Sequence, residues 1–261
     1  MLARKALAVV GVFTAASISA VAGTCTWTGL GDGTSWSQLA NWDSEALPAD
    51  GDSVVIANKS GKPLTVTLGE DVSVGAIKIS GATTADTVTL TGAGGLTVTA
   101  EGGWSFDGAL CPFYVLGPCS ITMDVPLTIP VGVNLQIGRG GESASQPPLT
   151  FDKAIRGAGG LTYHIGWQSC IVLNAENSYE GGTTIAGGGK TYDVDVNAAS
   201  PFGQNKTVNM AGGSIDNYAG GTFDYNLVLS SSGKATLRFR KNTTLTGTIT
   251  GDDARTGLLV F

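Results

Sequence analysis

The sequence Gly-Ala-Gly-Gly-Leu-Thr at residues 92–97 returns unchanged at residues 157–162, and a Gly-Trp pair follows each copy, at Trp104 and at Trp167. Such a repeat predicts that one local turn is built twice. The offset of 65 residues would hold about three coils of a β-solenoid, each of ~20–25 residues, because stacked repeats bury what one repeat cannot bury alone. A β-sandwich needs no such copies, so the repeat favours a solenoid.

Short β-prone runs lie on both sides of these copies. Residues 64–68 (Leu-Thr-Val-Thr-Leu), 87–90 (Thr-Val-Thr-Leu) and 206–210 (Lys-Thr-Val-Asn-Met) alternate polar and apolar side chains with period two, which predicts half-buried strands. The 39 glycines among 261 residues suit tight corners, because glycine adopts positive φ without steric cost. We therefore predict an all-β solenoid over residues 53–261.

The first 22 residues have the features of a secretory signal peptide. Arg4 and Lys5 give a positive start, residues 7–16 are apolar but too short to span a bilayer, and residues 20–22 (Ala-Val-Ala) fit a cleavage site. We predict export with removal of residues 1–22, which leaves no membrane-spanning segment; an uncleaved anchor is the alternative. Removal takes two of the 15 basic residues and none of the 21 acidic ones, leaving a net charge of −8. So acidic a chain is not expected to bind nucleic acid.

Residues 23–52 differ from the rest of the chain. They contain Trp27, Trp36 and Trp42 among polar and turn residues, with residues 37–47 as the one plausible helical turn. The open end of a solenoid exposes hydrogen-bonding strand edges and needs a cover. We predict that residues 23–52 are an N-terminal cap with these tryptophans packed inside it; the alternative is that their rings stack on sugars.

Four cysteines lie in the predicted exported part, where disulfides are permitted. Cys111 and Cys119 bracket a short segment that has proline at both ends, which makes them the preferred disulfide pair. Cys25 and Cys170 remain as the second candidate pair. No Cys-x-x-Cys spacing or nearby histidine supports a zinc site.

Residues 171–188 carry a family likeness. They read Ile-Val-Leu-Asn-Ala-Glu-Asn-Ser-Tyr-Glu-Gly-Gly-Thr-Thr-Ile-Ala-Gly-Gly and resemble the autotransporter-associated β-strand repeat, with Gly-Ala-Gly-Gly-Leu-Thr as its usual lead-in. The resemblance implies a right-handed parallel β-helix passenger exposed at a bacterial cell surface, often in adhesins. The residues that match its motif are Asn177, Tyr179, Gly181, Gly182 and Thr183.

Residues suited to catalysis are few. The single histidine, His164, lies in an expected strand and has no nucleophile elbow near it in the sequence. Asp193 and Asp195 share one strand face, as do Arg238 and Arg240, and the sequence leaves open whether these two faces meet. The aspartates alone are too few for a calcium site.

We therefore predict a non-enzymatic bacterial surface or extracellular β-solenoid, structural or adhesin-like, with no cofactor and no metal. Its partners would be surface glycans or other surface proteins. The alternatives are a β-helix polysaccharide lyase or hydrolase, and a glycan-binding module.

Overall fold

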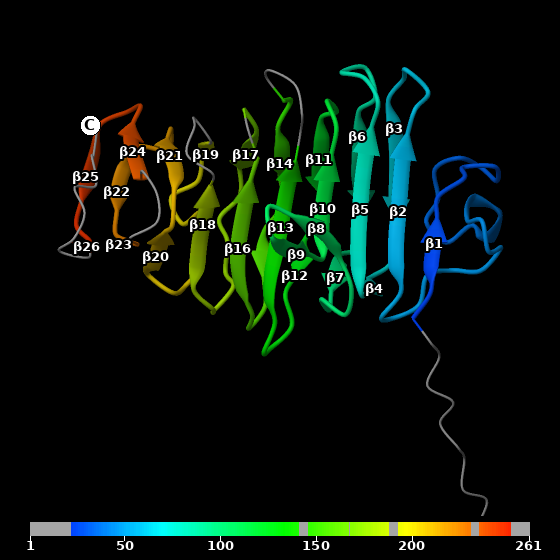
Figure 1. The fold of residues 1–261 in the computed structure, drawn as a ribbon, viewed down its shortest axis with the longest axis horizontal. Helices are drawn as coiled ribbons and strands as arrows, with labels where there is room; N and C mark the ends of the chain where they lie inside the picture. Colours follow the sequence, from blue (N-terminus) through cyan, green and yellow to red (C-terminus); the bar gives the residue numbers. More distant parts are fainter. Residues whose placement is uncertain (1–21, 141–145, 167, 188–192, 231–234, 252–261) are drawn as a thin grey trace, which may run out of the picture.

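Strands and corners alternate along the whole described chain. The structure, a computed structural model, describes residues 22–140, 146–166, 168–187, 193–230 and 235–251. Nearly all strands pair in parallel with strands one coil away, so the chain winds into a β-solenoid of about eight turns (Figure 1). The predicted fold class, an all-β parallel β-helix with an N-terminal Trp-rich cap, is confirmed.

One side of the solenoid is a ten-stranded sheet that runs from the cap to the other end (Figure 1). Each of the eight coils contributes one strand to it, and the cap and the last described residues add one strand each. In order, these strands are β1 (Thr24–Thr26), β2 (Ser53–Asn58), β5 (Ala76–Gly81), β10 (Phe113–Leu116), β13 (Asn134–Gly140), β16 (Gly160–Ile165), β18 (Thr183–Gly187), β20 (Thr207–Met210), β23 (Asn226–Leu229) and β26 (Ile249–Gly251).

Two further sides complete each coil. We call the passage from the ten-stranded to the eight-stranded sheet the first corner, the passage from there to the third side the second corner, and the return the third corner. The eight-stranded sheet contains β3 (Leu64–Leu68), β6 (Val88–Gly92), β11 (Ile121–Asp124), β14 (Leu149–Phe151), β17 (Cys170–Leu173), β19 (Asp193–Val196), β21 (Gly213–Asn217) and β24 (Ala235–Phe239). The third side contains β4 (Val72–Val74), β7 (Leu96–Val98), β12 (Leu127–Thr128) and β15 (Ile155–Arg156), and then the pair β22 (Gly221–Phe223) and β25 (Thr243–Leu245).

The strand register gives the length of a coil. Leu161 lies opposite Thr183, 22 residues on, and Thr183 lies opposite Val208, 25 residues on. These lengths agree with the coil size expected from the sequence. One coil is longer: Ile77 lies opposite Phe113, 36 residues on, because an antiparallel hairpin of β8 (Trp104–Phe106) and β9 (Ala109–Cys111) is inserted there.

This hairpin corrects the expected spacing of the two Gly-Ala-Gly-Gly-Leu-Thr copies, which lie two coils and one corner apart rather than three coils. The first copy leads from β6 to β7 and the second from β15 to β16. Locally they are alike, since φ is +130° at Gly92 and +108° at Gly157. A Cβ would lie 2.1 Å from the Leu68 carbonyl oxygen at Gly92, and 2.2 Å from that of Ile129 at Gly157. Both corners therefore require glycine, because backbone of the preceding coil lies against them.

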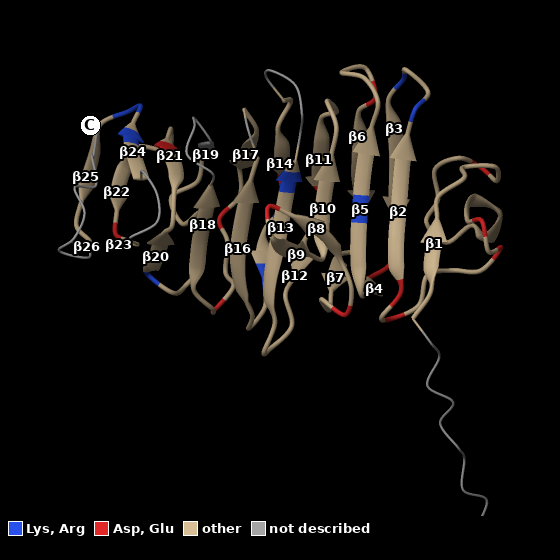
Figure 2. Cartoon of the chain, viewed as in Figure 1, with Lys and Arg blue, Asp and Glu red and all other residues tan. Residues whose placement is uncertain are grey.

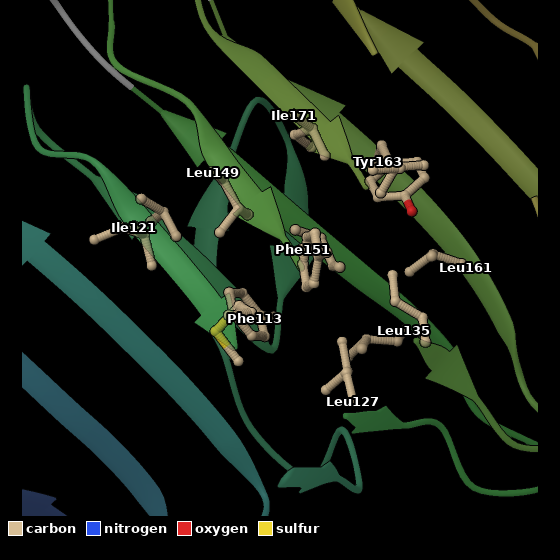
Figure 3. Close-up of a cluster of buried hydrophobic side chains, with 14 of the residues drawn as sticks. Phe113, Ile121, Leu127, Leu135, Leu149, Phe151, Leu161, Tyr163 and Ile171 are labelled. Atoms are coloured by element: carbon tan, nitrogen blue, oxygen red, sulfur yellow. The ribbon is translucent and has the colours of Figure 1, made fainter. Parts of the chain in front are cut away.

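The core is formed by side chains that alternate inward along every strand and stack on the same position of the next coil. Figure 3 shows such a column at Ile121, Leu149 and Ile171 of the eight-stranded sheet, with Phe113 and Tyr163 of the ten-stranded sheet near it. Burying one such side chain stabilises the fold by about 1.5–3 kcal/mol. One column of the ten-stranded sheet, all nearly or fully buried, consists of Val54, Ile77, Phe113, Ile137, Tyr163, Ile185 and Met210.

The cap is a cluster of tryptophans at the first coil. The Trp42 ring meets the Trp27 ring edge-on at 5.1 Å and the Trp36 ring at 4.8 Å between centroids. Its Nε1 donates a hydrogen bond to the Trp36 carbonyl oxygen, 2.8 Å away. All three side chains are at most 7% exposed, so the Trp-rich cap is confirmed. Rings as buried as these leave little surface for the alternative role of stacking on sugars. The expected helical turn is a 3-10 helix at Leu39–Asn41.

Backbone hydrogen bonds to carboxylates close the outer edge of the cap, where Figure 2 shows acidic and no basic residues around β1. Asp43 Oδ1 accepts from the N–H of Thr26, 2.8 Å away, on the outward edge of β1. Asp52 accepts from the N–H of Ala49 at 2.8 Å and of Gly23 at 2.7 Å. These two backbone donors hold the pKa of Asp52 below its usual value. The acidic composition of the cap therefore has a structural cause.

Candidate functional site

The residues of the recognised motif hold three coils together. Asn177 is 5% exposed. Its Oδ1 accepts from the N–H of Ile155 in the preceding coil at 2.7 Å, and its Nδ2 donates to the carbonyl of Pro201 in the following coil at 2.6 Å. Asn177 thus replaces a third-side strand, which this coil lacks, as the link between its neighbours.

The other motif residues also lie where neighbouring coils pack closely. The Tyr179 hydroxyl lies 2.6 Å from Thr183 Oγ1, and both side chains are fully buried. Thr183 Oγ1 also donates to the carbonyl of Phe202 in the next coil, 3.3 Å away. A Cβ at Gly181 would lie 2.5 Å from the Cα of Gly160, so glycine is required there. At Gly182 the nearest atom, Nδ2 of Asn205, would lie 3.9 Å from a Cβ.

The structure contains neither of the predicted disulfides. The segment between Cys111 and Cys119 is not a loop but contains strand β10, whose four extended residues span roughly 13 Å and hold the two thiols at opposite ends. Burial raises the pKa of Cys111 to about 11. Cys25 in β1 and Cys170 in β17 are separated by five strand spacings of the ten-stranded sheet, roughly 24 Å, and cannot pair either.

The two charged strands that the sequence singled out belong to the same eight-stranded sheet, with strand β21 between them. Asp195 lies opposite Asp216, which lies opposite Arg238. Asp216, whose side chain is 3% exposed, bonds the guanidinium groups of both Arg238 and Arg240, the latter at 2.6 Å. Asp193 opens the same strand as Asp195. Asp216 was not among the predicted site residues, although its period-two position in β21 could have placed it on this face.

His164 lies in β16, as expected, and its Nε2 is 2.6 Å from Gln136 Oε1 on the neighbouring strand. Burial lowers the pKa of His164, and the charge of Asp107 at the tip of the β8–β9 hairpin opposes this effect. The hairpin approaches this sheet closely at glycines: a Cβ at Gly140 or at Gly166 would lie within 3 Å of the Phe106 ring. Apart from the first Gly-Trp pair, no sequence pattern indicates this insertion. Trp167, in the second pair, lies outside the described residues.

A groove lies at the first corner because neighbouring corners differ in length. The corner between β10 and β11 takes only residues 117–120, whereas the corner before it takes residues 82–87. Figure 1 shows the corner between β10 and β11 lying lower than the corner between β5 and β6. The groove has a volume of about 480 Å³, and its lining includes Lys59, Ser80, Ala82, Leu116, Pro118 and Gln146.

Buried polar side chains fix the walls of this groove. Asp86, fully buried, accepts from the backbone N–H groups of Gly61 and Thr83, both at 2.7 Å, and so joins two successive corners. The Asn58 amide donates to the carbonyl oxygens of Lys62 at 2.7 Å and of Thr87 at 3.0 Å. The turn that carries Lys59 is therefore held in place before any ligand arrives, which lowers the cost of binding.

A buried guanidinium lies behind the groove floor. Arg139 faces inward from β13 and is 0% exposed. Its Nη1 donates to the carbonyls of Gly117 at 3.1 Å and Gly140 at 2.7 Å, and its Nη2 to those of Cys119 at 3.2 Å and Pro147 at 2.7 Å. Burial lowers the pKa of Arg139. Its position continues the inward alternation of the strand, and the same position is apolar in the neighbouring coils, where Val115 and Ile165 are buried.

Comparison of this chain with known protein families, curated proteins and solved structures finds no match. The family resemblance of residues 171–188 therefore stays a prediction from the residues themselves. Within the described ranges, no group of three or more His, Cys, Asp and Glu side chains is placed to hold a metal ion. No helix among the same residues is long and apolar enough to cross a membrane.

Proposed function

We propose that this chain is an exported bacterial surface or extracellular protein that acts as a rigid structural or adhesive β-solenoid, without enzymatic activity. The observation that carries this proposal is the use of the motif side chains. Asn177, Tyr179 and Thr183 make buried hydrogen bonds that include links from one coil to the next. Such side chains stiffen a stack of coils, and a stiff stack presents an extended surface.

Asp216, the buried carboxylate that contacts two arginines, also has a structural role. Both carboxylate oxygens of Asp216 bond guanidinium groups from the next strand. Glycoside hydrolysis by two carboxylates needs one that can be protonated as the acid and a second that is free to act as base or nucleophile. The two guanidinium groups occupy both oxygens of Asp216, which favours a structural role over the hydrolase alternative.

Cell fractionation tests the proposal. Intact cells that produce the full chain would be treated with an external protease, and the mass of the purified protein would be measured. We expect digestion on intact cells or recovery from the medium, together with loss of residues 1–22. Full protection in the cytoplasmic fraction, with residues 1–22 still attached, would contradict export and surface exposure.

A further inference from the structure

We propose that the first-corner groove binds the carboxylate of an acidic sugar, such as a uronic acid unit of a surface polysaccharide. This inference rests on the proposed surface function, since it names the partner of an adhesive protein. Three features of the groove carry it: the charge behind its floor, the charge at its rim, and its size and lining.

The charge behind the floor has no acidic partner among the described residues. All four hydrogen-bond acceptors of Arg139 are neutral carbonyls, and none of the ion pairs in the described part of the chain includes it. Its Nε is buried without a hydrogen-bond partner in those residues. Burying a cation without an anion is costly. A carboxylate in the groove, on the far side of Gly117, would offset part of that cost.

The rim adds a second cation. Lys59 is exposed and lines the groove, and no ion pair in the described ranges involves it. The chain as a whole carries a net charge of −6, so a site with two cations stands out against its surroundings. Salt screens charges beyond about 8 Å at physiological ionic strength. The buried Asp86 carboxylate beside the groove offsets one of these two positive charges, and it already accepts four hydrogen bonds. Among the described residues, Lys59 and Arg139 still leave the site with a net positive charge.

The size and lining select a sugar over a bare anion. A volume of about 480 Å³ exceeds the space that one carboxylate needs and falls within the range of small-molecule sites. Ala82, Leu116 and Pro118 supply apolar surface, while Ser80 and Gln146 supply polar groups. A sugar ring offers both, since its C–H face is apolar and its hydroxyls form hydrogen bonds.

Binding to the purified full chain tests this inference. Glucuronate and a glucuronate-containing disaccharide would be titrated by calorimetry and by saturation-transfer NMR, with glucose and the matching neutral disaccharide as ligand controls. We expect the acidic disaccharide to bind about tenfold more tightly than the neutral one, because its carboxylate forms a charge-assisted contact. Its affinity should fall when the salt concentration is raised about 10-fold, because salt screens that contact.

Two variants and one matched control locate the site. Lys59→Gln should weaken binding about fivefold, whereas Lys62→Gln, an exposed lysine of the same turn outside the groove lining, should leave it unchanged. Ala82→Trp should fill the groove and abolish binding without changing any charge. Circular dichroism and thermal melting would confirm that each variant is folded.

Several outcomes would overturn the inference: no binding of the acidic sugar, equal binding of its neutral counterpart, or equal losses from the two lysine substitutions. Displacement of the sugar by inorganic phosphate at equal concentration would show a simple anion site and refute the sugar assignment. These results are separate from the proposed function, because a protein can be located at the surface whether or not this groove binds.

Discussion

Replacement of Asn177 by alanine tests whether the two buried hydrogen bonds of its side chain stabilise the solenoid. The matched control is Asn174→Ala in the same coil. Asn174 also joins neighbouring coils, because its Nδ2 donates to Asp152 at 2.6 Å and its Oδ1 accepts from Asn197 at 2.7 Å. Its side chain is exposed, however, whereas that of Asn177 is buried. The pair therefore separates burial from hydrogen-bond geometry.

The expected magnitude follows from the groups that each substitution leaves behind. Asn177→Ala leaves the buried N–H of Ile155 and the carbonyl of Pro201 without their partners. An unsatisfied buried group costs about 1–3 kcal/mol, so we expect a loss of about 2–5 kcal/mol in the free energy of unfolding. Water replaces the lost bonds at Asn174, so that substitution should cost about 0.5 kcal/mol or less.

Urea unfolding followed by circular dichroism would measure both losses, and amide hydrogen exchange would locate them. Because each coil contacts only its neighbours, a weakened coil can open locally before the whole chain unfolds. Exchange at Ile155 and its neighbouring coils should accelerate in Asn177→Ala, while exchange in β2 and β5 should not. Equal losses from the two substitutions, or faster exchange along the entire chain, would refute the reasoning.

Three further predictions concern glycine, the thiols and the cap. Gly203→Ala should destabilise the protein by several kcal/mol more than Gly61→Ala in urea unfolding: both glycines have φ near +70°, but a Cβ at position 203 would lie 2.4 Å from a carbonyl oxygen and one at position 61 would contact nothing. Titration with a thiol reagent in denaturant without reductant should count four free thiols, and Cys111 should not react in the folded protein; a count of two would restore a disulfide. The pKa of Asp52 is lowered on folding, so its contribution is present above the unfolded value of ~3.9 and is lost as pH falls through the folded value. Tryptophan fluorescence should therefore shift to the red between about pH 4 and pH 2, and unchanged fluorescence would contradict the role of this carboxylate.

The fold could be predicted from the sequence because its causes are local and repeated. The alternation at residues 64–68 is strand β3 in the structure, with the same limits. Gly92 and Gly157 each mark a corner, since backbone of the preceding coil leaves no room for a side chain there. The number of coils between the two copies could not be predicted, because a hairpin insertion changes the length of one coil without changing the pattern of the others.

The disulfide prediction failed for a related reason. Prolines on both sides of residues 113–117 indicated a loop, yet Phe113 stacks between Ile77 and Ile137 in the core, and this burial favours the extended strand. The meeting of Asp216 with Arg238 could not be predicted because it depends on register between coils. A spacing of 22 residues places them opposite each other, whereas a shift of one residue would put one of them in the core.

Three of the departures from regular repetition lie in one half of the solenoid, and this distribution bears on function. The hairpin, the short corner at residues 117–120, and Arg139 at an inward position all lie between β5 and β14. The coils from β16 to β20 instead contain the Asn177 side chain, whose hydrogen bonds join neighbouring coils. In repeat proteins, insertions in single repeats gather on binding faces, whereas regular repeats provide the scaffold. A buried arginine where stacking favours an apolar side chain costs stability, and the proposed carboxylate site would give that charge a use. The functional surface is therefore to be sought at the coils that break the repeat.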